Sequence, residues 1–216
     1  MADRFSNRAG VKVVEAIIVT LQENREYLSE IDGAIGDGDH GVNMGKGATL
    51  AGQRLADGDF DMAGGLKVLS DVLMMEIGGA MGPLYGTFFR EMHKASVGEE
   101  WVDRVVYGAM LQEGLAGVKR LGKAEIGDKT MVDTLEPAVR AYQAATGRGE
   151  TFVEALAELN AAAMEGKEST KALVAKVGRA SRLGERSRGA LDAGATSAWL
   201  VLKAMSDAAE SILQAS

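Results

Sequence analysis

The chain has 216 residues, 46% of them hydrophobic, and a formal net charge of -7. A chain of this length buries enough surface for a substantial core, and we expect a single domain over residues 1–216. The acidic balance argues against nucleic acids and anionic membranes as main partners, because both bind basic surfaces. The absence of cysteine excludes disulfides and thiolate metal sites.

The first ten residues contain no apolar run of the kind that secretory signals have, and no stretch approaches the roughly 18 apolar residues of a membrane span. We therefore expect a cytoplasmic globular protein.

Apolar residues recur with helical spacing along most of the chain, whereas strict alternation is rare. The first such stripe includes Val11, Val14, Ile17 and Leu21. The fold class that we predict is all-α, with about eight helices. Their expected ranges are 9–28, 43–56, 62–78, 83–96, 100–120, 131–146, 151–177 (with a break at Gly166 as an option) and 195–214.

The connections between these helices differ in composition. The second (57–61), fourth (97–99) and sixth (147–150) are short and bland, whereas the first (32–43), third (78–82), fifth (121–130) and seventh (178–194) are rich in glycine and polar residues. If short connections make neighbouring helices antiparallel, all the odd-numbered connections emerge at one end of a bundle. The spacing thus predicts one composite site, and helix starts at that end favour anions.

Three carboxylates, Asp32, Asp37 and Asp39, lie within the first connection. Crowded carboxylates repel one another unless a cation lies among them, and hard oxygen ligands favour Mg²⁺, Mn²⁺ or Ca²⁺ over Zn²⁺. An EF-hand counted from Asp37 fails, because Val42 and Ala48 stand where glycine and glutamate are needed. Magnesium shared with a phosphate ligand fits better, and a solvated acidic turn is the alternative.

Glycines in the same connection match two phosphate-binding motifs only superficially. Gly36, Gly38 and Gly41 spell G-x-G-x-x-G, but a predicted helix, not a strand, precedes them. The run from Gly41 to Gly47 is one residue short of a P-loop. The remaining expectation is general: amides at a glycine-rich helix start, beside metal ligands, can hold phosphate.

Two other connections carry candidate phosphate ligands. Thr130, in the fifth connection, is a candidate helix cap or phosphate contact. The seventh connection contains four arginines that suit a polyphosphate clamp, although such a run is also typical of a solvated surface. They are Arg179, Arg182, Arg186 and Arg188.

Four motifs in order, IGDGDHGVNM, GGAMGPLYGTFF, GKAEIGDKTMVDTLEP and GRASRLGERSRGALDAGATS, resemble the nucleotide-binding L subunits of dihydroxyacetone kinases of the phosphotransferase-system type. The resemblance implies an eight-helix, antiparallel up-and-down bundle or barrel with the nucleotide at one end. It also implies two Mg²⁺ ions on Asp32, Asp37 and Asp39. The residues expected to border ADP or ATP are His40, Gly41, Asn43, Gly79, Ala80, Met81, Gly82, Gly122, Thr130, Met131, Arg179, Asp192 and Gly194.

The same resemblance implies partners. A separate K subunit would hold the ketose, an M subunit would recharge bound ADP to ATP, and a transcriptional regulator is a further expected partner. Two residues depart from the family pattern: Met81 replaces a common serine and Ala193 a common proline. Two alternatives stay open, an ATP-exchanging subunit for another ketose such as a tetrulose, and a nucleotide-sensing interaction module.

Overall fold

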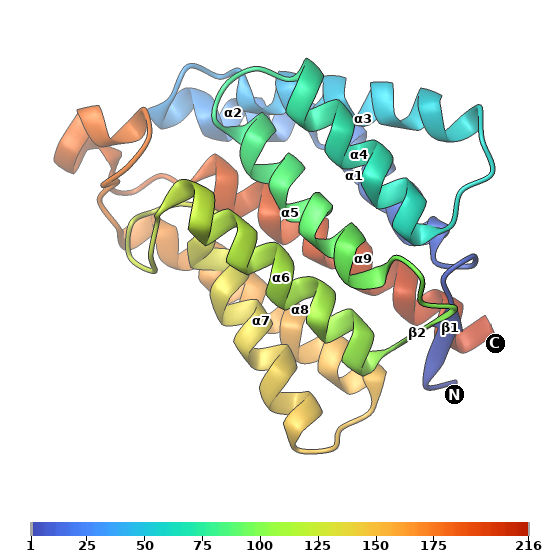
Figure 1. The fold of residues 1–216 in the computed structure, drawn as a ribbon. Helices are drawn as coiled ribbons and strands as arrows, with labels where there is room; N and C mark the ends of the chain where they lie inside the picture. Colours follow the sequence, from blue (N-terminus) through green and yellow to red (C-terminus); the bar gives the residue numbers. More distant parts are fainter. Residues whose placement is uncertain (1, 216) are drawn as a thin grey trace.

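The computed structural model describes residues 2–215, and helices dominate it (Figure 1). This confirms the all-α class. In chain order the elements are β1 (Arg4–Ser6), α1 (Val11–Glu23), α2 (Arg25–Ile35), α3 (His40–Ala56), α4 (Met62–Glu76), α5 (Met81–Ser96), β2 (Trp101–Asp103), α6 (Arg104–Gly122), α7 (Val132–Gly147), α8 (Phe152–Ser169), the 3₁₀-helices η1 (Thr170–Ala172) and η2 (Ala180–Ser187), and α9 (Ala193–Ala215).

The long helices form a closed ring. Each helix from α3 to α9 contacts the next one along the chain, and α1 contacts both α3 and α9. The helices turn their apolar stripes toward a shared core; α1, for example, buries Val13, Val14, Ile17 and Leu21. Burying each such side chain stabilises the folded chain by about 1.5–3 kcal/mol. Burial of the apolar stripes is therefore the main interaction that stabilises the ring.

The first predicted helix, 9–28, is divided in the structure. Asn24 leaves the helical conformation, with φ −97° and ψ 13°, and its side-chain amide donates to the Thr20 carbonyl at 2.8 Å. This bond closes α1, and α2 begins at Arg25 and runs on to Ile35. Asp32 therefore lies in the last turn of a helix, and only residues 36–39 connect α2 to α3.

Two short strands were not predicted. β1 and β2 pair antiparallel, with Phe5 opposite Val102, and both of these side chains are buried. Only three residues take part on each side, which is too few for the alternation of apolar residues to be noticed in the sequence.

Helices α7 and α8 come close together at Gly166. Pro137, in the second turn of α7, has no N–H to bond the Asp133 carbonyl. A Cβ on Gly166 would lie only 2.3 Å from that carbonyl oxygen, so glycine is required for this approach. Gly166 therefore does not break α8, which continues to Ser169, short of the predicted end at 177.

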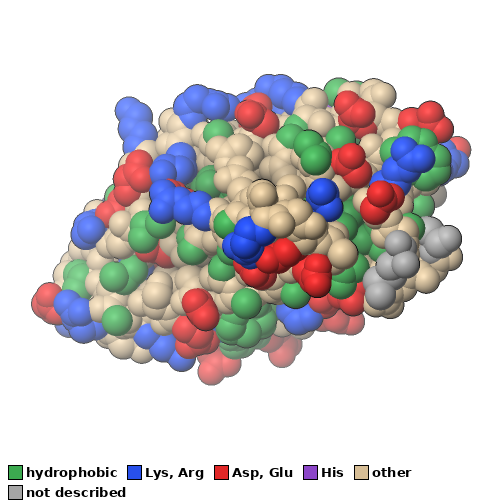
Figure 2. All heavy atoms as spheres, turned by 90° about the horizontal axis from the view of Figure 1, so that it is seen from below, with side chains coloured by type: hydrophobic (Ala, Val, Ile, Leu, Met, Phe, Trp, Pro, Cys, Tyr) green, Lys and Arg blue, Asp and Glu red, His purple; other side chains and the backbone are tan. Residues whose placement is uncertain are grey.

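The four polar connections all lie at one end of the ring, on the left in Figure 1, while both ends of the chain lie at the other. On the face shown in Figure 2, basic and acidic side chains are intermingled, and hydrophobic ones form small separate groups. Within residues 2–215, no helix has both the length and the apolar character needed to cross a bilayer.

Candidate functional site

A cavity of about 470 Å³ opens at the end of the ring where the polar connections meet. All four odd-numbered connections contribute to its wall, as the helix order predicted. The predicted residues that line it are Asp32, Asp37, Asp39, His40, Gly79, Ala80, Met81, Gly122, Thr130, Met131, Arg179, Asp192 and Gly194.

Three predicted residues, Gly41, Asn43 and Gly82, are not among those lining the cavity. Helix packing accounts for both glycines: a Cβ on Gly41 would lie 2.0 Å from the Arg25 carbonyl oxygen, and one on Gly82 would lie 2.3 Å from that of Ile77. A nucleotide contact by these three residues stays a prediction.

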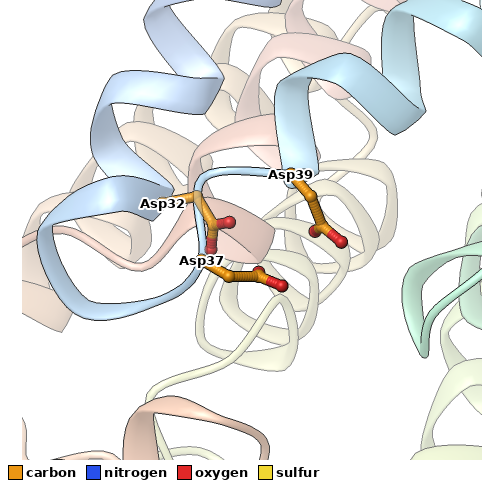
Figure 3. Close-up of side chains that lie close together, drawn as sticks. All are labelled: Asp32, Asp37 and Asp39. Carbon is orange, nitrogen blue, oxygen red and sulfur yellow. The ribbon is translucent and has the colours of Figure 1, made fainter.

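The three aspartates converge, although they come from different local structures (Figure 3). Asp32 lies in the last turn of α2, Asp37 in the connection and Asp39 directly before α3. One carboxylate oxygen from each lies within 4.8 Å of the others. Two oxygens on opposite sides of one Mg²⁺ are about 4.2 Å apart, so small side-chain rotations suffice to share a cation. The residues fit a magnesium centre.

Two of the helices that begin at the cavity, α3 and α5, differ from those that begin at the far end. At the far end, Asp61, Asp103 and Thr151 cap α4, α6 and α8 with their side chains. At the cavity, the residues before α3 and α5, Asp39 and Ala80, make no side-chain cap. The first amide of α3, that of His40, donates to the Asp32 carboxylate at 3.3 Å, so the start of α5 is the better placed of the two to bind an anion.

The loop before α5 leaves room for such an anion. Gly79 has a φ of 78°, which strains any other residue, and a Cβ there would meet nothing within 4 Å. Its backbone is thus exposed to the cavity. Met81 lines the same wall with a half-buried side chain.

Of the four arginines in the seventh connection, only Arg179 lines the cavity, where it forms an ion pair with Asp37. Arg188 instead pairs with Glu185 at 3.1 Å, and Arg182 and Arg186 are exposed. Of the predicted clamp of four arginines, only Arg179 is therefore placed at the cavity, and a phosphate contact by it stays a prediction.

His40 is held by a chain of buried hydroxyl groups. Its Nε2 lies 2.8 Å from the Ser197 hydroxyl, which in turn lies 2.6 Å from the Tyr85 hydroxyl. Burial lowers the pKa of His40 to about 4, although the nearby Asp32 carboxylate acts in the opposite direction. His40 is thus neutral at pH 7 and offers the cavity a hydrogen-bonding group without a positive charge.

Asp192 caps the start of α9 and has a raised pKa. Its Oδ2 accepts the Ala195 amide at 2.7 Å, which caps the helix. Burial raises the pKa of this carboxyl to about 7, while the Ala195 amide and the Lys129 ammonium oppose the shift. At neutral pH it is therefore partly protonated, unlike an ordinary aspartate.

Sequence reasoning missed Lys129 and the apolar part of the wall. Lys129 is only 1% exposed, and nothing in its sequence context distinguishes it from a surface lysine. The apolar residues belong to helical stripes that look like ordinary core. They are Ile35, Leu84, Val118, Leu121, Val132 and Val177. An apolar wall beside an acidic cluster and the uncapped start of α5 suits a ligand with both a flat ring and phosphates.

Comparisons with known proteins agree with this geometry. A family model described as "DAK2 domain" matches residues 34–207. The chain is 40% identical over 186 residues to the PEP-dependent dihydroxyacetone kinase 1, ADP-binding subunit DhaL, of Listeria innocua, covering 86% of this chain and 88% of that protein. It is 38% identical over 186 residues to the ADP-binding subunit DhaL of the PEP-dependent dihydroxyacetone kinase of Escherichia coli K12, covering 86% and 89%.

A solved structure has the same fold. The dihydroxyacetone kinase from C. freundii in complex with AMP-PNP and Mg2+ superposes with a TM-score of 0.68 and 27% sequence identity. The match covers 93% of this chain and 33% of that one, so this chain spans about a third of the C. freundii kinase.

Proposed function

The chain belongs to the DAK2 domain family, and on that premise we propose that it is the ADP-binding subunit of a dihydroxyacetone kinase. The observation that carries this proposal is the cavity itself, in which three clustered aspartates, Arg179 and the uncapped start of α5 surround one space beside an apolar wall. Relatives named as ADP-binding subunits and matched over most of both chains support it.

Asp32, Asp37 and Asp39 would hold two Mg²⁺ ions, and their oxygen donors suit that cation. Magnesium bound there supplies charge neutralisation at phosphate oxygens, which is the main requirement of phosphoryl transfer. The uncapped start of α5 orients the phosphates, and the Arg179 guanidinium binds them with paired hydrogen bonds. The apolar wall takes the base and excludes water from that side.

His40 is held neutral by burial, and the Ser197 hydroxyl beside its Nε2 is fully buried and is not among the residues that line the cavity. The chain therefore positions the phosphoryl donor, and we assign dihydroxyacetone to a separate K subunit. A phosphorylated M subunit would recharge the bound ADP, so that ADP acts as a retained cofactor. In this assignment, the donor subunit contributes to catalysis by positioning the phosphoryl group and by stabilising its negative charge.

The test is reconstitution with K and M subunits and two donors. With phosphoenolpyruvate and the general phosphotransferase proteins, we expect phosphorylation of dihydroxyacetone, together with ADP released on denaturing the purified chain. Omission of the M subunit is the control, and it should abolish transfer from phosphoenolpyruvate.

Other outcomes identify the alternatives. Turnover with ATP but not with phosphoenolpyruvate would contradict the donor assignment and indicate an ATP-exchanging subunit. Activity confined to a tetrulose such as erythrulose would overturn the substrate. Tight ADP binding without any transfer would indicate a nucleotide-sensing module.

A further inference from the structure

Lys129 is a buried lysine at the end of the connection between α6 and α7. Its Nζ donates to three backbone carbonyls, those of Thr170 at 2.7 Å, Leu173 at 3.3 Å and Ala190 at 2.6 Å. A lysine ammonium has three donors, so all of its hydrogen-bonding capacity is used. The residue also has a φ of 63°, an unfavourable conformation that is kept only where the surroundings impose it.

The three carbonyls mark the base of an arm, residues 174–189, which contains η2 and carries Arg179. Thr170 and Leu173 precede the arm and Ala190 follows it. One ammonium therefore binds both the segment that enters the arm and the segment that leaves it. The backbone bond from the Gly189 amide to the Lys171 carbonyl, 2.8 Å, closes the same base.

Beyond this base, the Ala175 amide donates to the buried Ser187 hydroxyl at 2.9 Å, and η2 contacts α2. Most of its side chains are exposed or half-buried, and its glycines at 178 and 184 have positive φ. The Lys176 amide donates to the Asp128 carbonyl at 3.1 Å, which again ties the arm to the connection before α7. Farther out, the Arg179 pair with Asp37 joins the arm to the acidic cluster.

We propose that Lys129 is a positioning residue that tethers this arm to the connection before α7 and so keeps Arg179 at the phosphate end of the cavity. The inference rests on the proposed function for its effect on nucleotide, but the tether itself is a property of the chain alone. Lys129 is adjacent to Thr130 and Met131, which line the cavity. The tether therefore fixes two walls of the cavity relative to each other.

Lysine is the residue suited to this place because the carbonyls approach it from three directions. Methionine has a similar length and no donor, and it would leave three carbonyls without the ammonium. Hydrogen bonds to a charged group are stronger than neutral ones, so their loss loosens the base substantially. Burial lowers the pKa of Lys129, whereas Asp192 and Asp133 lie near enough to favour its charged form, so removing the ammonium also leaves their charges less compensated.

The first experiment measures amide hydrogen exchange in Lys129→Met, with Lys171→Met as the matched control. Lys171 is exposed, and within residues 2–215 its side chain pairs with Glu168 alone. In Lys129→Met, we expect the Lys176 and Gly189 amides to exchange at least about tenfold faster, with amides in α1 and α4 unchanged. Unchanged protection of the arm in a folded Lys129→Met protein would overturn the tether.

The second experiment is a double-mutant cycle on MgADP affinity. Lys129→Met and Arg179→Ala should each weaken binding by about tenfold, and the double variant should be weakened by about tenfold rather than a hundredfold. If the two losses of affinity multiply to about a hundredfold in the double variant, Lys129 does not act through Arg179. If Lys129→Met does not fold, Lys129→Gln, which keeps two donors, takes its place in both experiments. If the wild-type protein binds no MgADP, the proposed function fails, while hydrogen exchange still decides on the tether.

Discussion

The Arg179 guanidinium, on the arm before α9, forms an ion pair with the Asp37 carboxylate, which belongs to the connection between α2 and α3. The side chains are 58% and 43% exposed, so the pair is solvated and weak. One of the three clustered carboxylates thus carries the protein's own cation. A divalent ion bound at the cluster would compete with Arg179, which would then be free to bind a phosphate.

This competition predicts opposite effects of Arg179→Ala on two ligands. For Mg²⁺ alone, the variant should bind about threefold more tightly, since an exposed ion pair contributes up to about 1 kcal/mol. For MgADP it should bind more weakly, because a guanidinium contact with phosphate is lost. Calorimetric titration of each ligand checks both signs, and weaker binding of Mg²⁺ alone would contradict the competition.

Asp37→Asn tests the acidic cluster. Because Asp37 is exposed and far from the core, we expect the melting temperature and helical content to stay close to those of the wild type. MgADP affinity should fall at least about a hundredfold, since the amide is a poor ligand for Mg²⁺. Asp57→Asn, at the opposite end of α3, is the matched control and should leave affinity unchanged. Equal affinities of the two variants would remove the metal assignment.

Gly41 allows the close packing of α2 against α3, which a substitution can test. In Gly41→Ala, the new Cβ would lie 2.0 Å from the Arg25 carbonyl and 2.6 Å from the Ser29 amide nitrogen, so α2 and α3 must move apart. We expect a loss of about 2 kcal/mol or more in the free energy of unfolding. Gly33→Ala is the control, because a Cβ there meets nothing within 4 Å and alanine favours the helix by up to about 1 kcal/mol. Chemical denaturation would contradict this account if Gly41→Ala were as stable as Gly33→Ala.

Asp192 should make stability depend on pH. Its folded pKa, about 7, lies above its ordinary value of 3.8, so the folded state binds a proton that the unfolded state has released. The resulting stabilisation is complete below about pH 3.8 and is lost as pH rises through 7. In Asp192→Asn, which keeps the oxygen that caps α9, this loss should be absent.

The measurement is the free energy of unfolding of both proteins from pH 4 to 8. Relative to the wild type, the free energy of unfolding of the variant should rise by a few kcal/mol at most between pH 4 and pH 8, because one pKa unit corresponds to about 1.4 kcal/mol. His40 has a lowered pKa and titrates with the opposite sign, its stabilisation being lost as pH falls from about 6.5 toward 4. Because both proteins contain His40, its contribution cancels in the difference. Parallel pH profiles would contradict the raised pKa of Asp192.

The convergence of distant connections could be predicted because helices are stiff and alternate in direction. Asp32 and Asp192 come from opposite halves of the chain, yet both line one cavity. In a bundle of antiparallel helices, all odd-numbered connections lie at the same end. This follows from the order of the helices alone, without knowledge of how they pack. The acidic cluster was recognisable because its members are close in sequence.

Features that depend on tertiary packing were not predictable in this way. The break at Asn24 rests on one side-chain bond to Thr20, and Asn residues within helical patterns do not always break a helix. The course of the arm, which separates Arg179 from the other arginines, follows from η2 and its positive-φ glycine at 184. The burial of Lys129 depends on carbonyls from distant segments.

The most direct measurement is a crystal structure of the chain grown with ADP and Mn²⁺, with the manganese located by anomalous scattering. The account predicts manganese bound by Asp32, Asp37 and Asp39, with the diphosphate at the starts of α3 and α5 and the base against the apolar wall. Manganese bound elsewhere, or ADP outside this cavity, would contradict it.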